Sequence, residues 1–225
     1  MNGRRVLFDV DGTLIDAVAN QRRIWHSWAR GHGLDPAEVH AVAQRTRPAD
    51  TFALVAPDAD PAACLAEFHA LEDEDVRTGR YGAFPGAAEL LGGLPAGTWA
   101  LVTSNYEHRV RGRFARTGLP APGLVVDAAA VAEGKPSPVP YLRAAELLGA
   151  DPADCLVVED APSGIEAGLR AGMTVWSVNT PVPQAGPDGG SGGRAEPDRA
   201  PGAHRSFGTL HEAAPAILAW AAGTH

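Results

Sequence analysis

The feature that most constrains the fold is a regular alternation, from residue 85 onward, of short apolar runs with amphipathic stretches of about ten to fifteen residues. The apolar runs predict buried strands, and the Gly and Pro residues that flank the longer stretches predict helix boundaries. Strands separated by helices imply right-handed crossovers, so the sequence predicts an α/β fold whose parallel sheet has helices on both faces. The expected strands are 99–102, 124–126, 155–158, 175–178 and 205–207.

An earlier apolar run, Val6–Phe8, predicts one more buried strand, because it is β-branched and aromatic and too short for a helix. Asp9 and Asp11 follow it directly and flank the turn at Gly12. Ligands of open parallel sheets bind just beyond the carboxyl ends of the strands, which makes this acid pair a candidate site. Taken alone, Asp-x-Asp-Gly is equally compatible with a plain surface turn, since Asp and Gly dominate turns.

Between these two regions the pattern is helical throughout, without a strand pattern. An apolar face that carries Trp25 and Trp28 predicts a helix over residues 17–31. Asp35–Pro36 and Asp60–Pro61 each predict a helix start, with Asp as the cap and Pro at the first helical position. The two tryptophans fit either the core of a helical domain or a platform for a sugar ring.

These patterns predict two domains. An α/β core comprises residues 1–15 and 85–225, and a helical cap comprises residues 16–84, inserted after the first strand. Within the core, residues 181–203 are rich in Gly and Pro and nearly devoid of large apolar side chains. Such a segment cannot bury enough surface to offset its ordering entropy, so we expect a flexible loop there.

Charge and cysteine content exclude several classes of function. The 225 residues carry a formal net charge of −8, with 27 acidic residues against 19 Lys and Arg, so nucleic acid is not an expected partner. Cys64 and Cys155 lie too far apart for a zinc or redox motif and predict reduced core residues. No apolar run approaches the roughly 20 residues that cross a bilayer, and no signal-type segment is present. We therefore expect a cytoplasmic protein without a membrane partner.

Polar clusters follow the predicted strands or precede a helix at four places. They should meet at one edge of the sheet, because the carboxyl ends of parallel strands point the same way. Four acids around a single lysine would strongly disfavour one another's ionisation, and a hard divalent cation resolves this conflict. Mg²⁺ fits best, because it takes one or two carboxylates and leaves positions for a substrate phosphate. The clusters are Asp9 with Asp11, Thr103–Ser104–Asn105, Lys135, and Glu159–Asp160.

With their neighbours, these clusters resemble the four ordered motifs of the haloacid dehalogenase superfamily of phosphatases. The resemblance covers nearly the whole chain and is greatest to the beta-phosphoglucomutase-like branch, with its bacterial sugar phosphatases and glycerol-phosphate phosphatases. It implies a Rossmann-like parallel core, an inserted helical cap, and Mg²⁺-dependent chemistry through an aspartyl phosphate. The motifs are Phe8–Leu14, Val102–Asn105, Gly134–Pro136 and Val158–Gly164.

The resemblance also implies catalytic roles. Asp9 would attack phosphorus, and Asp11 would protonate the leaving alcohol and then activate water. An acid at position 11 disfavours dehalogenation, because superfamily members that displace halide lack it. The implied metal ligands are Asp9, Asp11 through its backbone carbonyl, and Asp160, with Glu159 as a further ligand or as a partner of the ligands. The implied phosphate and substrate ligands are Thr103, Ser104, Asn105, Lys135 and Arg47.

Two of these assignments compete with plainer alternatives. Asn105 is equally compatible with a simple helix cap. Arg47 stands where relatives carry a His-Gly-Arg loop that contacts substrate, but Arg45 and Thr46 replace the His and Gly. Arg47 is therefore either a substrate ligand or a solvated surface residue, and the bound sugar is left open.

The sequence thus predicts a Mg²⁺-dependent phosphatase for a small phosphorylated sugar or polyol, acting as a monomer or weak homodimer. A beta-phosphoglucomutase-like mutase is the main alternative, since it uses the same nucleophile and returns the phosphoryl group to the sugar. A phosphoglycolate phosphatase and a catalytically silent binding module on the same fold are further alternatives.

Overall fold

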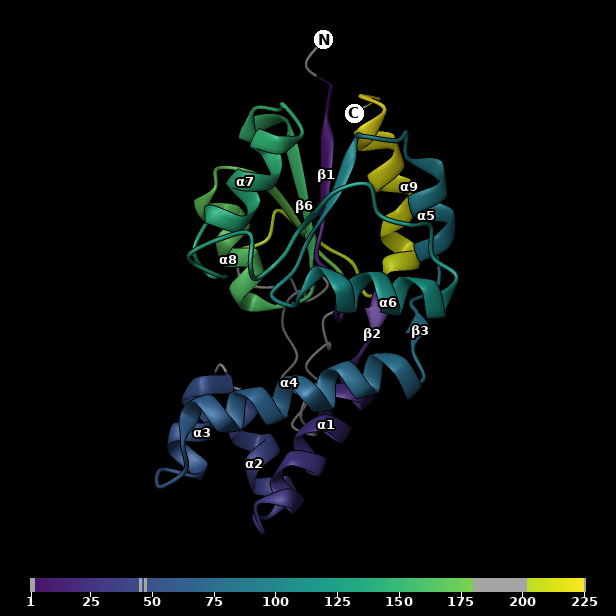
Figure 1. Ribbon diagram of the computed structural model, residues 1–225. Helices are drawn as coiled ribbons and strands as arrows, with labels where there is room; N and C mark the ends of the chain where they lie inside the picture. Colours follow the sequence, from purple (N-terminus) through teal and green to yellow (C-terminus); the bar gives the residue numbers. More distant parts are fainter. Residues whose placement is uncertain (1–2, 45, 47, 180–201, 225) are drawn as a thin grey trace, which may run out of the picture. The chain divides into compact units, whose positions relative to one another are not determined.

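The computed structural model describes residues 3–44, 46, 48–179 and 202–224. The chain forms two compact units, one of Met1–Asp16 with Gly82–His225 and the other of Ala17–Tyr81 (Figure 1). Arg47 and all but the last two residues of the expected loop at 181–203 lie outside the described residues.

The first unit contains a six-stranded parallel sheet in the order β5-β4-β1-β6-β7-β8. Figure 1 shows helices α7 and α8 on one side of this sheet and α5 and α9 on the other. The expected α/β fold is therefore confirmed. The strands are β1 (Arg5–Phe8), β4 (Trp99–Val102), β5 (Val125–Val126), β6 (Cys155–Glu159), β7 (Thr174–Ser177) and β8 (Arg205–Ser206). The helices are α5 (Ala87–Gly93), α6 (Glu107–Thr117), α7 (Val139–Leu147), α8 (Pro162–Arg170) and α9 (Leu210–Ala221), with a 3₁₀ turn at Pro152–Asp154.

The centre of the sheet positions the candidate site. Strand β1 lies between β4 and β6, and Val6, Leu7 and Phe8 are fully buried. Phe8 is paired with Leu101 of β4 on one side and with Val158 of β6 on the other. The polar residues that follow these three strands therefore emerge side by side at one edge of the sheet.

The second unit is a bundle of α1 (Val18–Gly31), α2 (Pro36–Ala43), α3 (Pro48–Val55) and α4 (Pro61–Thr78). Asp35 caps α2 by accepting the N–H groups of Ala37 and Glu38, and Asp60 caps α4 by accepting that of Ala62, as the Asp-Pro pairs predict. The sequence pattern did not predict α3.

The tryptophans of the second unit form its core. The Trp25 ring lies 4.3 Å from that of Phe68, and the Trp28 ring lies 4.8 Å from that of Phe52, between ring centroids. Trp25 and Trp28 are both buried, which favours the core interpretation over a sugar platform. The nearby Cys64 is a buried free thiol, as is Cys155 in the first unit, and both predictions are confirmed.

The expectation that residues 16–84 are helical throughout was wrong at both ends. Strands β2 (Ile15–Asp16) and β3 (Gly82–Ala83) pair antiparallel, with Ile15 opposite Ala83. Two-residue strands are too short to carry an alternating pattern, so only tertiary pairing reveals them.

In the described part of the chain, no helix has both the length and the apolarity that a membrane span requires.

Candidate active site

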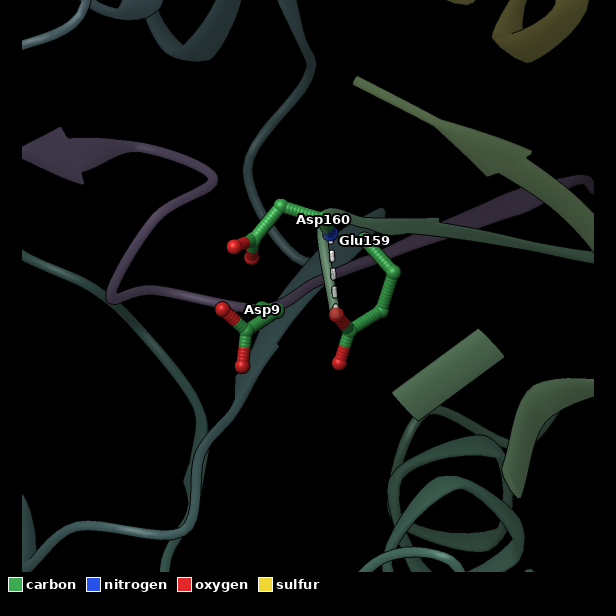
Figure 2. A group of neighbouring side chains, drawn as sticks. All are labelled: Asp9, Glu159 and Asp160. Atoms are coloured by element: carbon green, nitrogen blue, oxygen red, sulfur yellow. Dashed lines mark hydrogen bonds between the residues drawn. The ribbon is translucent and has the colours of Figure 1, made fainter. Parts of the chain in front are cut away.

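Three carboxylates meet at the edge of the sheet where β1 and β6 end. Asp9 follows β1, Glu159 is the last residue of β6, and Asp160 comes next. One carboxylate oxygen from each residue lies within 4.8 Å of the other two, as Figure 2 illustrates. The parallel register between β1 and β6 explains this convergence, because it pairs Phe8 with Val158 just before the acids.

Lys135 joins two of these acids. Its Nζ donates to Asp9 Oδ1 at 2.6 Å, to Glu159 Oε1 at 2.6 Å and to the carbonyl of Val102 at 3.0 Å. The lysine side chain is only 5% exposed, so these acceptors replace water around a buried ammonium group. The lysine lies at the ends of the three central strands, where its charge can also meet an anionic substrate.

Glu159 is fully buried and surrounded by donors. Its Oε1 accepts from Lys135 and from the Tyr141 hydroxyl at 3.0 Å, and its Oε2 accepts the N–H groups of Asp160 and Ala161, each at 2.9 Å. Figure 2 shows the bond back to the Asp160 backbone. With four hydrogen bonds, this carboxylate is suited to hold Lys135 and the turn at Asp160 in place, more than to bind a metal itself.

Asp160 is held against the loop that follows β1. The Thr13 hydroxyl donates to Asp160 Oδ1 at 2.9 Å. Gly12 has a φ of 101°, and a Cβ at this position would overlap Asp160 Oδ2. Glycine is therefore required here both for its backbone conformation and for the close approach of the carboxylate.

Burial and mutual repulsion govern the protonation of these groups. Burial, followed by the negative charge of Glu159, raises the pKa of Asp9 well above its usual range despite the opposing effect of Lys135. Burial and the charge of Glu159 raise the pKa of Asp160 to about 7. Burial alone would lower the pKa of Lys135, but the charges of Asp9 and Glu159 outweigh it and raise that pKa well above its usual range.

The donor set fits a hard divalent cation. Among the described residues, no hydrogen-bond donor reaches Asp9 Oδ2 or Asp160 Oδ2, whereas the second oxygen of each side chain is already bonded. In the part of the chain that the structure describes, this group of possible ligands consists of carboxylates without His or Cys, a donor set that suits Mg²⁺. A cation between them would also offset the burial and the charge of Glu159, which raise both pKa values.

The residues after β4 form the side of the site next to Asp9. The N–H of Asn105 donates to Thr103 Oγ1 at 3.0 Å, and Asn105 Oδ1 accepts the N–H of Tyr106 at 2.8 Å, just before α6. Thr103 is buried and Ser104 is exposed. The Asn105 side chain thus shapes the chain just before α6.

The Asp11 carboxylate is not one of the three clustered acids and has a partner of its own. Its Oδ2 accepts from the guanidinium of Arg113 on α6, and this arginine is 1% exposed. Sequence reasoning missed Arg113, although it precedes Phe114 on a face that the apolar pattern marks as buried. It also missed Thr13, Tyr141 and Asn179, whose contacts join distant segments and leave no local pattern.

The chain is similar to known proteins in sequence and in fold. Residues 4–172 match the family model described as hydrolase: haloacid dehalogenase-like hydrolase. Hexitol phosphatase A of Escherichia coli is 44% identical over 188 residues, which cover 81% of this chain and 86% of that protein. Glycerol-1-phosphate phosphohydrolase 2 of Saccharomyces cerevisiae is 33% identical over 186 residues, which cover 77% of this chain and 74% of that protein.

Among solved structures, CbbY from Rhodobacter sphaeroides in complex with phosphate matches with a TM-score of 0.73. The match covers 94% of this chain and 96% of that chain at 21% identity, and so speaks for the fold alone. Because the family model spans three quarters of the sequence and the E. coli relative is 44% identical, the chain belongs to the haloacid dehalogenase-like hydrolases.

Proposed function

We propose that this hydrolase is a Mg²⁺-dependent phosphatase that acts on a small phosphorylated sugar or polyol through an aspartyl phosphate on Asp9. It is a phosphoric monoester hydrolase, in keeping with relatives named hexitol phosphatase and glycerol-1-phosphate phosphohydrolase. Both names specify phosphorylated polyols. The observation that carries the proposal is the joint contact of Lys135 with Asp9 and Glu159, beside Asp160.

In the first half of the reaction, a carboxylate oxygen of Asp9 attacks phosphorus and the bond from phosphorus to the ester oxygen breaks. The leaving oxygen takes a proton from Asp11. In the second half, water attacks phosphorus and gives its proton to Asp11, and the bond from phosphorus to Asp9 breaks. Inorganic phosphate and the alcohol are the products, and both aspartates return to their starting states.

The remaining residues bind the reacting groups. Lys135, Thr103 and the N–H of Ser104 would hold the phosphate oxygens and stabilise their charge during transfer. Asp9, Asp160 and the carbonyl of Asp11 would hold Mg²⁺, which when bound supplies positive charge next to the transferring phosphoryl group. Arg47, which lies outside the described residues, is proposed as a further substrate ligand on the resemblance alone.

A phosphate-release screen tests the proposal. The panel contains hexitol phosphates, glycerol phosphates, sugar phosphates and phosphoglycolate, each assayed with Mg²⁺ and with EDTA. We expect the highest kcat/KM for a polyol or sugar phosphate, loss of turnover in EDTA, and loss of turnover in Asp9→Asn. Phosphate release that survives Asp9→Asn would refute the role of Asp9.

The mutase alternative has a separate readout. With glucose 1-phosphate as substrate, a phosphatase releases inorganic phosphate, whereas a mutase forms glucose 6-phosphate. We expect phosphate release here, and accumulation of glucose 6-phosphate would contradict the proposal.

A further inference from the structure

Arg113 is a deeply buried cation near the site, and the proposed mechanism gives it no role. It lies on α6, which also carries Arg109, Arg111 and Arg116. Arg111 is 44% exposed and pairs with Glu107 on the helix surface, whereas the Arg113 side chain is 1% exposed. Burying a guanidinium is costly, since it stays charged at any ordinary pH, so it needs a hydrogen-bond acceptor held in a fixed place.

One such acceptor is the carboxyl group of Asp11, 102 positions away in the sequence. Arg113 donates to Asp11 Oδ2, and in the described part of the chain no group bonds to the buried Asp11 Oδ1. Lys135 bonds to Asp9 and Glu159 instead. Lys135 and Arg113 therefore bond to different acids, and Arg113 sets the orientation of Asp11.

This division has a chemical consequence for proton transfer. A guanidinium has donors and no acceptor. The carboxyl oxygen that accepts its hydrogen bond is therefore not the oxygen that carries the transferable proton. The other oxygen, Oδ1, is left to carry the proton to the leaving group and to take it back from water. Fixing one oxygen thus selects the oxygen that reacts.

We propose that Arg113 is a positioning residue for proton transfer by Asp11, an inference that rests on the phosphatase function proposed above. It holds Asp11 Oδ2, so that Oδ1 is the oxygen that exchanges the proton with the ester oxygen and with water. Arg113 does not touch the reacting atoms, and its effect on the reaction passes through Asp11.

The dependence on the leaving group tests this role. An alkoxide needs a proton to leave, whereas 4-nitrophenolate leaves without one. We therefore expect Arg113→Met to lower kcat/KM for the best alkyl phosphate of the panel by roughly 100-fold more than for 4-nitrophenyl phosphate. A structural defect would lower both values alike. Arg111→Met removes an exposed arginine from the same helix and should leave both values close to wild type.

A double-mutant cycle tests the path through Asp11. In an Asp11→Asn background, Arg113→Met should cause little further loss for the alkyl ester, because the group that it positions is already disabled. Arg113→Lys keeps the charge with a different donor geometry and should recover part of the alkyl activity. Thermal unfolding will show whether Arg113→Met is folded. If it is not, the two esters are compared with Arg113→Lys instead.

Three results would overturn the inference while the wild type remains an active phosphatase. They are equal losses for the two esters in every Arg113 variant, no loss in any, and multiplicative losses in the double variant. A wild-type chain that releases phosphate from neither ester would instead refute the proposed function, and this inference with it.

Discussion

At the scale of single residues, Gly164 shows how tightly the site is filled. It lies on α8 against Glu159, and a Cβ built on it would overlap Glu159 Oε1. Glu159 cannot move aside cheaply, because Lys135, Tyr141 and two backbone N–H groups hold its oxygens. The absence of one side chain therefore helps to place the lysine on which the proposed chemistry depends.

We expect Gly164→Ala to lower the free energy of unfolding by about 1–3 kcal/mol, as overpacking typically does, and to lower kcat as well. Gly92→Ala is the matched control. Gly92 lies in α5, and a Cβ there would meet nothing within 4 Å, so this change should leave stability unchanged or raise it by up to about 1 kcal/mol. Urea unfolding measures both variants, and equal stability of the two would contradict the prediction.

The sequence could predict those site residues that occupy local patterns. Asp9, Glu159 and Asp160 follow apolar runs that the chain must bury, and Lys135 belongs to a recognisable motif. Tyr141 could not be found this way, because its apolar ring sits on an ordinary helix face and only the fold brings its hydroxyl to Glu159.

At the scale of elements, Asn179 joins three segments. Its Nδ2 donates to the carbonyls of Gly12 and Thr13 at 2.9 and 3.1 Å, and its Oδ1 accepts the N–H of Leu210, the first residue of α9, at 2.8 Å. Asn179 lies shortly after the end of β7 and has a φ of 53°, which costs about 1 kcal/mol for a residue with a side chain. These bonds hold the loop after β1 against α9.

We expect Asn179→Asp to lower the free energy of unfolding by about 1–3 kcal/mol, because it turns a carboxylate toward two carbonyl oxygens. Phosphatase activity should fall with it, since the loop carries Asp11. Asn179→Gly also loses the bond from the Leu210 N–H, but it introduces no repulsion and relieves the backbone, so its loss should be smaller. Thermal unfolding and kcat measure both effects, and an Asn179→Asp variant as stable as wild type would refute the role of the amide.

Elements were predictable where packing imposes a repeated pattern. Strand β4 was expected at 99–102 and is found there, because four consecutive apolar residues fit a strand buried on both faces. Strands β2 and β3 were not predicted from the sequence. Two residues are too few to show an alternating hydrophobic pattern, and the paired strands are separated in the sequence by the whole second unit. The bonds of Glu159 with Lys135 and Tyr141 were equally out of reach, because these residues lie on segments that meet Glu159 only after folding.

At the scale of the whole molecule, the buried acids connect stability to pH. The pKa of Asp160 is about 7, against 3.8 for a free side chain. The folded chain therefore binds more protons than the unfolded chain between these pH values, so this contribution is complete below about pH 4 and is lost as pH rises through about 7. The raised pKa of Asp9 acts in the same direction.

In EDTA, we expect wild-type stability relative to Asp160→Asn to fall as pH rises from 5 to 8. Added Mg²⁺ should raise the melting temperature of the wild type by several degrees at pH 8 and less at pH 5, since binding requires ionised ligands. Asp58→Asn, in an exposed loop, should keep the wild-type pH dependence. Differential scanning calorimetry measures these shifts. A Mg²⁺ effect that is the same at both pH values, or larger at pH 5, would contradict the prediction.

The ladder of β2 and β3 has a consequence for the segment between them. Ile15 lies opposite Ala83, so the chain leaves the sheet domain and re-enters it at neighbouring points of one antiparallel pair. Because these two points are paired, a shorter or longer segment could join the same two ends without altering the register of the six-stranded sheet.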